Sequence, residues 1–99
     1  MYRVIFSDEA TIDRQRIANW YENIRPDLKI ECDSEIVKTI RTYLTKHPKI
    51  AQIIHGNIRR IPLKRFPFSV FYTIDEQKQT VQILAIEHHK QQPKPYTNN

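Results

Sequence analysis

The chain has 99 residues, of which 39% are hydrophobic and 27% are charged, and its net charge is +5. This length supports one hydrophobic core and hence one domain, and the apolar content excludes wholesale disorder. The apolar stretch at the N-terminus is only a few residues long and is followed at once by acidic residues, which fits neither a signal peptide nor a membrane span. We therefore expect one folded, cytoplasmic domain over residues 1–99.

The positive charge is concentrated in the second half of the chain. Residues 1–50 hold nine Lys and Arg against eight Asp and Glu, whereas residues 51–99 hold seven against three. A basic surface attracts nucleic acid through counterion release and an acidic protein partner through steering. The sign of the charge does not separate these two classes of partner.

The first pattern along the chain predicts a short strand and then a helix. Residues 2–6 suit a strand, while Ser7 suits an N-cap and is followed by two acidic residues that suit the first helical turn. Trp20 and Tyr21 lie on the apolar face of this helix, so we expect both in the core. The helix should end before Pro26, because the residue preceding a proline is disfavoured in helical geometry.

A second helix is predicted by apolar residues that gather on one face between residues 28 and 44, and it should end near His47 and Pro48. Two such helices form an antiparallel hairpin, and neither buries its apolar stripe without a further layer. Cys32 is the only cysteine, which excludes an internal disulfide, and we expect it to be buried. His47 and His55 are isolated and show no zinc-type spacing, so we predict no metal site.

The second half of the chain supplies the further layer as three predicted strands, at residues 58–63, 68–74 and 80–87. The tail, residues 91–99, is polar with two prolines and should run over the surface as an extended segment. The predicted fold class is α+β, with an N-terminal strand, an antiparallel helix hairpin on one face of a small antiparallel sheet, and a C-terminal three-stranded meander. The other sheet face would be available for binding.

The segment "RRIPLKRFPFSVFYTID", residues 59–75, gathers four cations just before its most strand-like part: Arg59, Arg60, Lys64 and Arg65. Adjacent residues of a strand point to opposite faces, so Arg59 and Arg60 cannot both line a site on one face. The pattern leaves both of them open. The alternative is that these cations form a solvated sheet edge that prevents pairing with other chains.

Four stretches together resemble the RelE/ParE superfamily of bacterial toxins, the small basic partners in type II toxin–antitoxin modules. They are "ANWYENI", "TYLTKHP", "RFPFSVFYTID" and "ILAIEHHKQQPKPY". The resemblance covers nearly the whole chain, and the third and fourth stretches are its most specific part. The long helical hairpin favours the ParE-like branch, the plasmid stabilisation proteins.

The resemblance implies a RelE/ParE-like fold and a toxin that is neutralised by a cognate antitoxin. ParE-like members inhibit DNA gyrase, and this is the function that we expect. Two alternatives stay open: a RelE-like endoribonuclease that cleaves messenger RNA on the ribosome, and a degenerate, non-toxic member that only binds its antitoxin. No cofactor and no membrane partner is implied. We expect the antitoxin to bring an acidic or amphipathic segment that folds as it binds the helix hairpin or the basic sheet face.

A nuclease of this type is an enzyme that needs no metal, because the 2′-hydroxyl attacks the neighbouring phosphorus while side chains move protons and stabilise the phosphate charge. Arginine suits phosphate oxygens, and histidine suits proton transfer near neutral pH. For this alternative we predict Arg60, His88 and Tyr96 as the catalytic residues.

The choice between the two neighbouring histidines follows the same alternation as that between the arginines. His88 is in register with Leu84 and Ile86 and stands where the superfamily has its histidine, so we favour it over His89. The residues predicted to bind the target or nucleic acid are Arg59, Arg60, Lys64, Arg65, His89 and Lys90.

Overall fold

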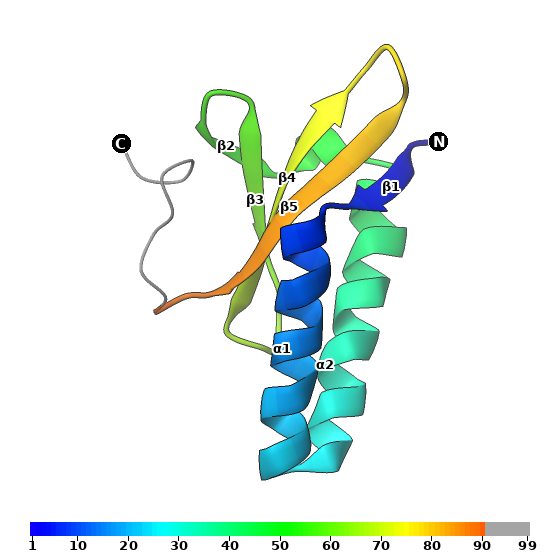
Figure 1. The fold of residues 1–99 in the computed structure, drawn as a ribbon. Coiled ribbons are helices and arrows are strands. Elements are labelled where there is room, and N and C mark those ends of the chain that lie inside the picture. Colours follow the sequence, from blue (N-terminus) through cyan, green and yellow to red (C-terminus); the bar gives the residue numbers. More distant parts are fainter. Residues whose placement is uncertain (91–99) are drawn as a thin grey trace.

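The structure is a computed structural model that describes residues 1–90 (Figure 1). The predicted tail lies outside the described residues. The elements, in chain order, are β1 (Arg3–Phe6), α1 (Asp8–Ile24), α2 (Pro26–Thr39), the π-helical turn η1 (Ile40–Leu44), the 3-10 turn η2 (Pro48–Ile50), β2 (Gln52–His55), β3 (Ile58–Pro62), β4 (Phe68–Asp75) and β5 (Thr80–His88).

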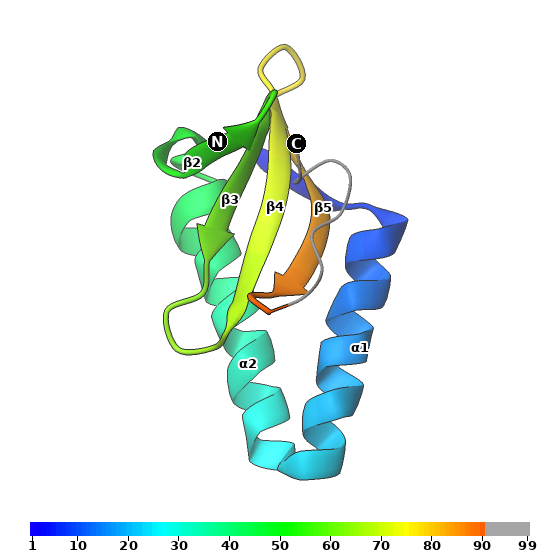
Figure 2. The ribbon, with the colours of Figure 1, turned by 90° about the vertical axis from the view of Figure 1, so that its left-hand side faces the viewer.

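The five strands form one sheet in the order β1-β5-β4-β3-β2, and the two helices cover one of its faces (Figures 1 and 2). We name this covered side the inner face and the opposite side the outer face. The predicted α+β architecture is confirmed. Strands β2 to β5 pair antiparallel, as expected, but β1 runs parallel to β5, so the sheet is mixed. A parallel neighbour is possible here because the whole helix hairpin lies between the two strands in sequence.

Strand β2 was not foreseen as a separate element. It has only four residues, and its pairing with β3 shifts register between Ile53 and His55. A strand this short and irregular carries too few alternating positions to be recognised from sequence. Its backbone hydrogen bonds to β3 place β2 at the edge of the sheet, next to Arg59 and Arg60. We name residues 59–65, which hold the four predicted cations, the basic segment.

The helix boundaries follow the local signals. The Ser7 side chain accepts a hydrogen bond of 3.0 Å from the backbone N–H of Ala10, which caps α1. Arg25 is extended and separates the helices, and Pro26 occupies the first turn of α2. The second helix, however, does not continue unchanged to His47, because α2 ends at Thr39 and a π-helical turn follows.

The core lies between the inner face and the helices, and Cys32 is buried in it as expected. Tyr21 is also buried, but the expectation for Trp20 is wrong, because 52% of its surface is exposed. The buried positions of α1 are Ala10, Asp13, Ile17 and Tyr21, which follow a spacing of three to four residues. Trp20 falls beside this stripe, where its ring contacts Tyr21 edge-on with centroids 5.0 Å apart.

A bulge in β5 is the main irregularity of the sheet. Phe71 of β4 pairs with Ala85 and Tyr72 pairs with Ile83, so Leu84 is left without a partner in the ladder. Leu84 and Ala85 both pack into the small cluster on the outer face, whereas Ile83 packs into the inner core. An extra residue of this kind reverses the facing of every later residue of the strand.

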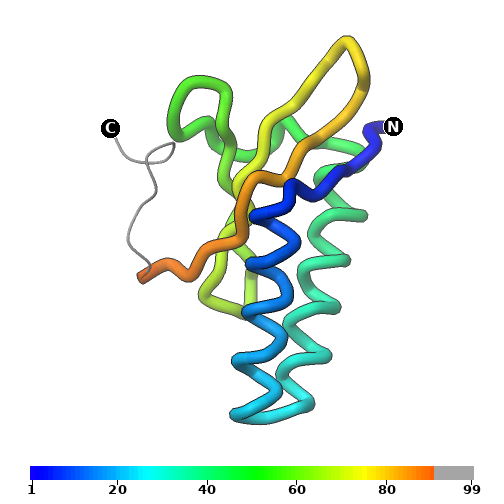
Figure 3. Tube along the Cα trace, viewed as in Figure 1, coloured from blue at the N-terminus to red at the C-terminus, as the bar shows by residue number. Residues whose placement is uncertain are grey.

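The start of α1 binds the backbone at this bulge. Ser7 donates from its N–H to the carbonyl of Ile83 at 2.9 Å and from its hydroxyl to the carbonyl of Leu84 at 3.0 Å. The Asp13 carboxylate accepts from the N–H of Ile86 at 3.0 Å. Figure 3 shows β5 bending where α1 begins beside it. Ser7, the N-cap of α1, and Asp13 thus bind backbone groups of β5 at the bulge.

We predict that Asp13→Ala lowers the free energy of unfolding by about 1–3 kcal/mol, because it leaves a buried N–H of Ile86 without an acceptor. Asp13→Asn keeps an oxygen at this position and should cost less than about 1 kcal/mol at neutral pH. Urea unfolding of the three proteins measures the difference. Equal stability of Asp13→Ala and the wild type would contradict a structural role for this contact.

The same pair of proteins tests the charge of Asp13. Burial raises the pKa of this carboxyl, since only 4% of the residue is exposed. An acid whose pKa is higher in the folded than in the unfolded state destabilises the folded state once it ionises, so the charge costs stability above the unfolded pKa of about 4. The stability of Asp13→Asn relative to the wild type should therefore rise between about pH 4 and pH 7.

Candidate functional site

The two adjacent arginines of β3 face opposite sides of the sheet. Arg59 pairs with Tyr72 of the inner core, and Arg60 pairs with Phe71 of the outer cluster. The expectation that only one of them can line a site on a given face therefore agrees with the register. Which of the two arginines belongs to a binding site therefore depends on whether that site lies on the inner or the outer face.

Arg59 has a structural role. Its guanidinium donates hydrogen bonds to the carbonyls of Lys49 and Ala51, at 3.0 and 2.8 Å. The Tyr72 hydroxyl donates to the carbonyl of Pro48 at 2.6 Å, and burial raises the pKa of Tyr72 to about 12. Arg59 and Tyr72 together hold η2 and the start of β2 against the sheet, which occupies Arg59 within the protein.

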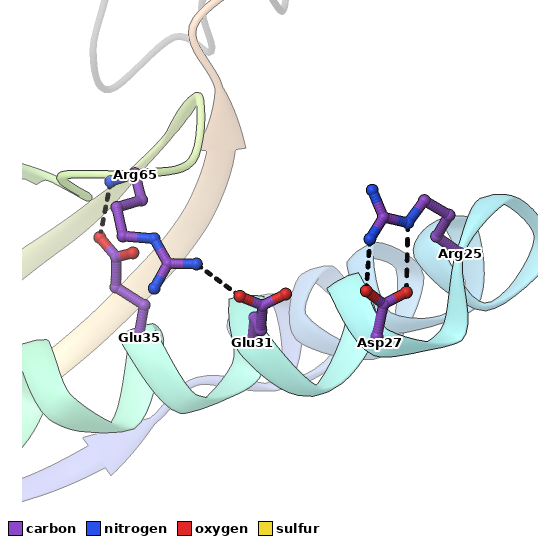
Figure 4. A network of polar contacts seen from close by, with 5 residues as sticks. All are labelled: Arg25, Asp27, Glu31, Glu35 and Arg65. Carbon is purple, nitrogen blue, oxygen red and sulfur yellow. Dashed lines mark hydrogen bonds and ion pairs between the residues drawn. The ribbon is translucent and has the colours of Figure 1, made fainter.

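Two further predicted cations, Lys64 and Arg65, are held by carboxylates of α2. The Arg65 guanidinium pairs with Glu31 at 2.7 Å, and the Arg65 backbone N–H donates to Glu35 (Figure 4). The backbone N–H of Lys64 also donates to Glu35. The Lys64 ammonium lies 6.0 Å from the centre of the Tyr43 ring. The connection between β3 and β4 is therefore fastened to α2, and part of the positive charge of the basic segment is neutralised there.

Arg60 differs from the other two arginines of this segment, Arg59 and Arg65, which are held by internal partners. Its side chain makes no hydrogen bond or ion pair with another residue in the range 1–90, and it is half-buried at the outer face. A guanidinium without a partner can bind a carboxylate or a phosphate without first breaking an internal contact. On this geometry Arg60 is the better candidate of the two arginines.

The bulge in β5 also decides where the two histidines lie. His88 pairs with Phe68 on the inner side, with the ring planes at 86° and the centroids 5.2 Å apart. His89 lies with its Nε2 atom 3.0 Å from the hydroxyl of Ser69, which is on the outer side. The sequence register joined His88 with Leu84 and Ile86, but the bulge places Leu84 and Ile86 on opposite faces.

Arg60 consequently shares the outer face with His89 rather than with His88. Glu87, which sequence reasoning missed, pairs with Ser69 on this face and is 4% exposed. Only the bulge assigns it to the outer face. Lys90 is exposed in the turn that follows β5, where its backbone N–H donates to the His88 ring at 3.0 Å. Tyr96 lies outside the described residues.

Other reactive groups are poorly placed for chemistry. Cys32 is 1% exposed, and burial raises its pKa to about 12, so its thiol is not a nucleophile near neutral pH. Over residues 1–90, no three His, Cys, Asp or Glu side chains are grouped so that they could hold a metal ion. No helix in this range is long and apolar enough to cross a membrane.

Comparison with known protein families shows to which family this chain belongs. A sequence model described as the ParE toxin of the type II toxin–antitoxin system parDE matches residues 4–93. The chain belongs to the ParE toxin family. No significant match was found among curated proteins.

Solved structures of low sequence identity share the fold of this ParE family member. A structure of the chromosomal ParDE system from P. aeruginosa has a TM-score of 0.75 at 21% identity, covering 89% of this chain and 96% of that one. The RelBE2 complex from Mycobacterium tuberculosis has a TM-score of 0.61 at 20% identity, covering 88% and 96%. The isolated E. coli RelE toxin has a TM-score of 0.60 at 10% identity, covering 93% and 88%.

The two arginines should differ in their effect on stability. We predict that Arg59→Gln lowers the free energy of unfolding by about 1–2 kcal/mol, because it removes two charge-assisted hydrogen bonds to carbonyls at a partly exposed site. Arg60→Gln, which breaks no internal contact, should change it by less than about 0.5 kcal/mol. Urea unfolding of both variants measures this, and equal losses would contradict the division between the two residues.

Proposed function

We propose that this protein is the toxin of a type II toxin–antitoxin module, that it acts in the cytoplasm by binding and inhibiting DNA gyrase, and that its cognate antitoxin neutralises it. The family match over residues 4–93 carries this proposal, since the matching family is ParE rather than RelE. The likeness to the ParDE structure at a TM-score of 0.75 supports it. In this function Arg60 contacts the target through its free guanidinium, and Lys90 adds exposed positive charge.

The geometry of the basic segment is also consistent with binding rather than cleavage. Arg59 and Arg65 are committed to internal partners, and His88 faces the inner side. This leaves few free groups for the proton transfers and charge stabilisation that RNA cleavage requires. An inhibitor that binds its target needs complementary charge and shape but no matched acid and base.

A RelE-like endoribonuclease is the second candidate, and one observation favours it. Arg60 and His89 lie on the same outer face, so a cation for the phosphate and an imidazole share one surface, while Glu87 of this face is buried. In this function Arg60 stabilises the charge on the phosphate and His89 exchanges a proton with the reacting oxygens. His88 and Tyr96, the other predicted catalytic residues, belong to the same hypothesis.

Expression in a bacterial host without antitoxin separates these functions. For a gyrase inhibitor we predict growth arrest with an induced DNA-damage response and intact transcripts. Arg60→Glu should relieve the arrest at least about tenfold in surviving cells, because it reverses the charge of the free guanidinium. Arg41→Glu, a charge reversal at another exposed arginine, is the matched control and should leave the arrest unchanged.

The alternatives give different results in the same cultures. New transcript ends at ribosome positions, lost in both His89→Ala and Arg60→Glu, would show the nuclease and overturn the gyrase proposal. Normal growth at confirmed soluble levels of folded protein would show the third alternative, a member that only binds its antitoxin. His88→Ala, made alongside His89→Ala, tests whether the histidine predicted from the sequence is the catalytic one.

A further inference from the structure

The middle of the chain holds a long stretch without any acidic residue. Residues 36–74 contain eight Lys and Arg but no Asp or Glu. Five of these cations have a place in the structure already: Arg59, Lys64 and Arg65 contact internal partners, Lys49 forms an ion pair, and Arg60 lies on the outer face. The remaining three are Lys38, Arg41 and Lys46, and we name them the α2 ridge.

The α2 ridge follows the end of α2 and the π-helical turn η1. Lys38 and Arg41 are three residues apart, a spacing that places two side chains on the same side of an α-helix. The N–H of Thr45 donates to the carbonyl of Ile40, five residues earlier, at 3.0 Å. This turn places Arg41 and Lys46 about one turn apart, whereas a regular α-helix would rotate them about 140° away from each other. The π-helical turn therefore aligns the third cation with the first two.

The three cations of the ridge are available to a partner. Their side chains are exposed, and none of them forms a hydrogen bond or an ion pair with another residue in the range 1–90. The carboxylates of α2 that precede the ridge are occupied, because Glu31 pairs with the Arg65 guanidinium at 2.7 Å and Glu35 accepts from the Arg65 N–H at 3.0 Å. The ridge thus presents uncompensated positive charge to solvent.

The length of the ridge suits a row of phosphates. The eight-residue step from Lys38 to Lys46 is about 12 Å long at the usual helical rise per residue. Duplex DNA carries one negative charge per about 1.7 Å of its axis, so about seven phosphate charges lie along this length. Lys and Arg bind phosphate oxygens through charge-assisted hydrogen bonds and release counterions as they do so.

The surroundings of the ridge favour duplex DNA over a protein, a membrane or a single strand. Docking of a protein or a membrane relies on exposed apolar side chains, and no large hydrophobic residue between Ile30 and Ile50 is exposed. Single strands bind by stacking their bases on aromatic rings. Tyr43 is the only Phe, Tyr or Trp of this interval, and it is half-buried with the Lys64 ammonium 6.0 Å from its ring centre.

We propose that the α2 ridge binds the phosphate backbone of duplex DNA without sequence preference. Contacts to phosphates position a protein on DNA but carry no sequence information. The inference goes beyond the proposed inhibition of gyrase, because it gives this protein an affinity for DNA that requires no gyrase. The ridge belongs to α2 and η1, whereas Arg60 lies on the outer face of the sheet, so separate variants address the two surfaces.

The test measures binding of the purified full-length protein to a short labelled DNA duplex by fluorescence anisotropy at several salt concentrations. Lys38→Gln, Arg41→Gln and Lys46→Gln should each make the plot of log K against log salt shallower by about 0.9, because each removes one phosphate contact. The triple variant should bind at least about tenfold more weakly than the wild type at low salt. Circular dichroism and the melting temperature confirm that each variant is folded.

Two control variants remove the same charge elsewhere. Arg16→Gln changes a side chain that is 71% exposed on α1, and Arg60→Gln changes the outer face. Each should alter the salt slope by less than about 0.3, because salt screens exposed charges that lie outside the contact. A loss of slope in Arg60→Gln with none in the ridge variants would place DNA on the outer face and overturn the proposal.

Competition identifies the ligand. Unlabelled duplexes of different sequence should displace the probe equally well, since the contacts are to phosphates. Single-stranded RNA of equal length and polyglutamate of equal charge should both compete less well. Stronger competition by either of them would contradict duplex DNA as the ligand of the ridge.

The outcomes separate this inference from the proposed function. If the wild type does not bind the duplex, or if the ridge variants lose no more than Arg16→Gln, the inference is wrong, while growth arrest and its relief by Arg60→Glu are unaffected. If Arg41→Glu loses duplex binding but still arrests growth, the ridge binds DNA independently of the contact with the target.

Discussion

The contact between the start of α1 and the bulge in β5 is the interaction on which the arrangement of both sheet faces depends. Ser7 and Asp13 bind backbone groups of Ile83, Leu84 and Ile86, where the pairing of β5 with β4 is disturbed. An unpaired buried backbone group costs about as much as a lost hydrogen bond, so the bulge is stable because α1 supplies the missing partners. The helix is thereby fixed on the inner face, and the C-terminal half of β5 has its facing reversed.

The same fold gives some cations of the basic segment internal partners and leaves others available to a binding partner. Register directs Arg59 inward, where it binds carbonyls of the chain that leads into β2, and α2 holds Arg65 through Glu31. Exposed ion pairs such as the latter contribute about 0–1 kcal/mol each, so their main effect is to position the connection rather than to stabilise the fold. Net charge alone therefore overstates what the segment offers a partner, and Arg60 is its one guanidinium without a hydrogen bond or ion pair to the rest of residues 1–90.

Features set by local chemistry were predictable from sequence, and features set by distant contacts were not. The Ser7 cap, the break at Pro26 and the strands at β3, β4 and β5 depend on neighbouring residues. The parallel pairing of β1, the exposure of Trp20 and the outer-face position of Glu87 depend on segments far apart in the chain. In the candidate site, the alternation of strand residues correctly predicted that Arg59 and Arg60 face opposite sides of the sheet. The same alternation gave the wrong register for His88 with Leu84 and Ile86, because one extra residue in β5 changes the facing of the residues after it.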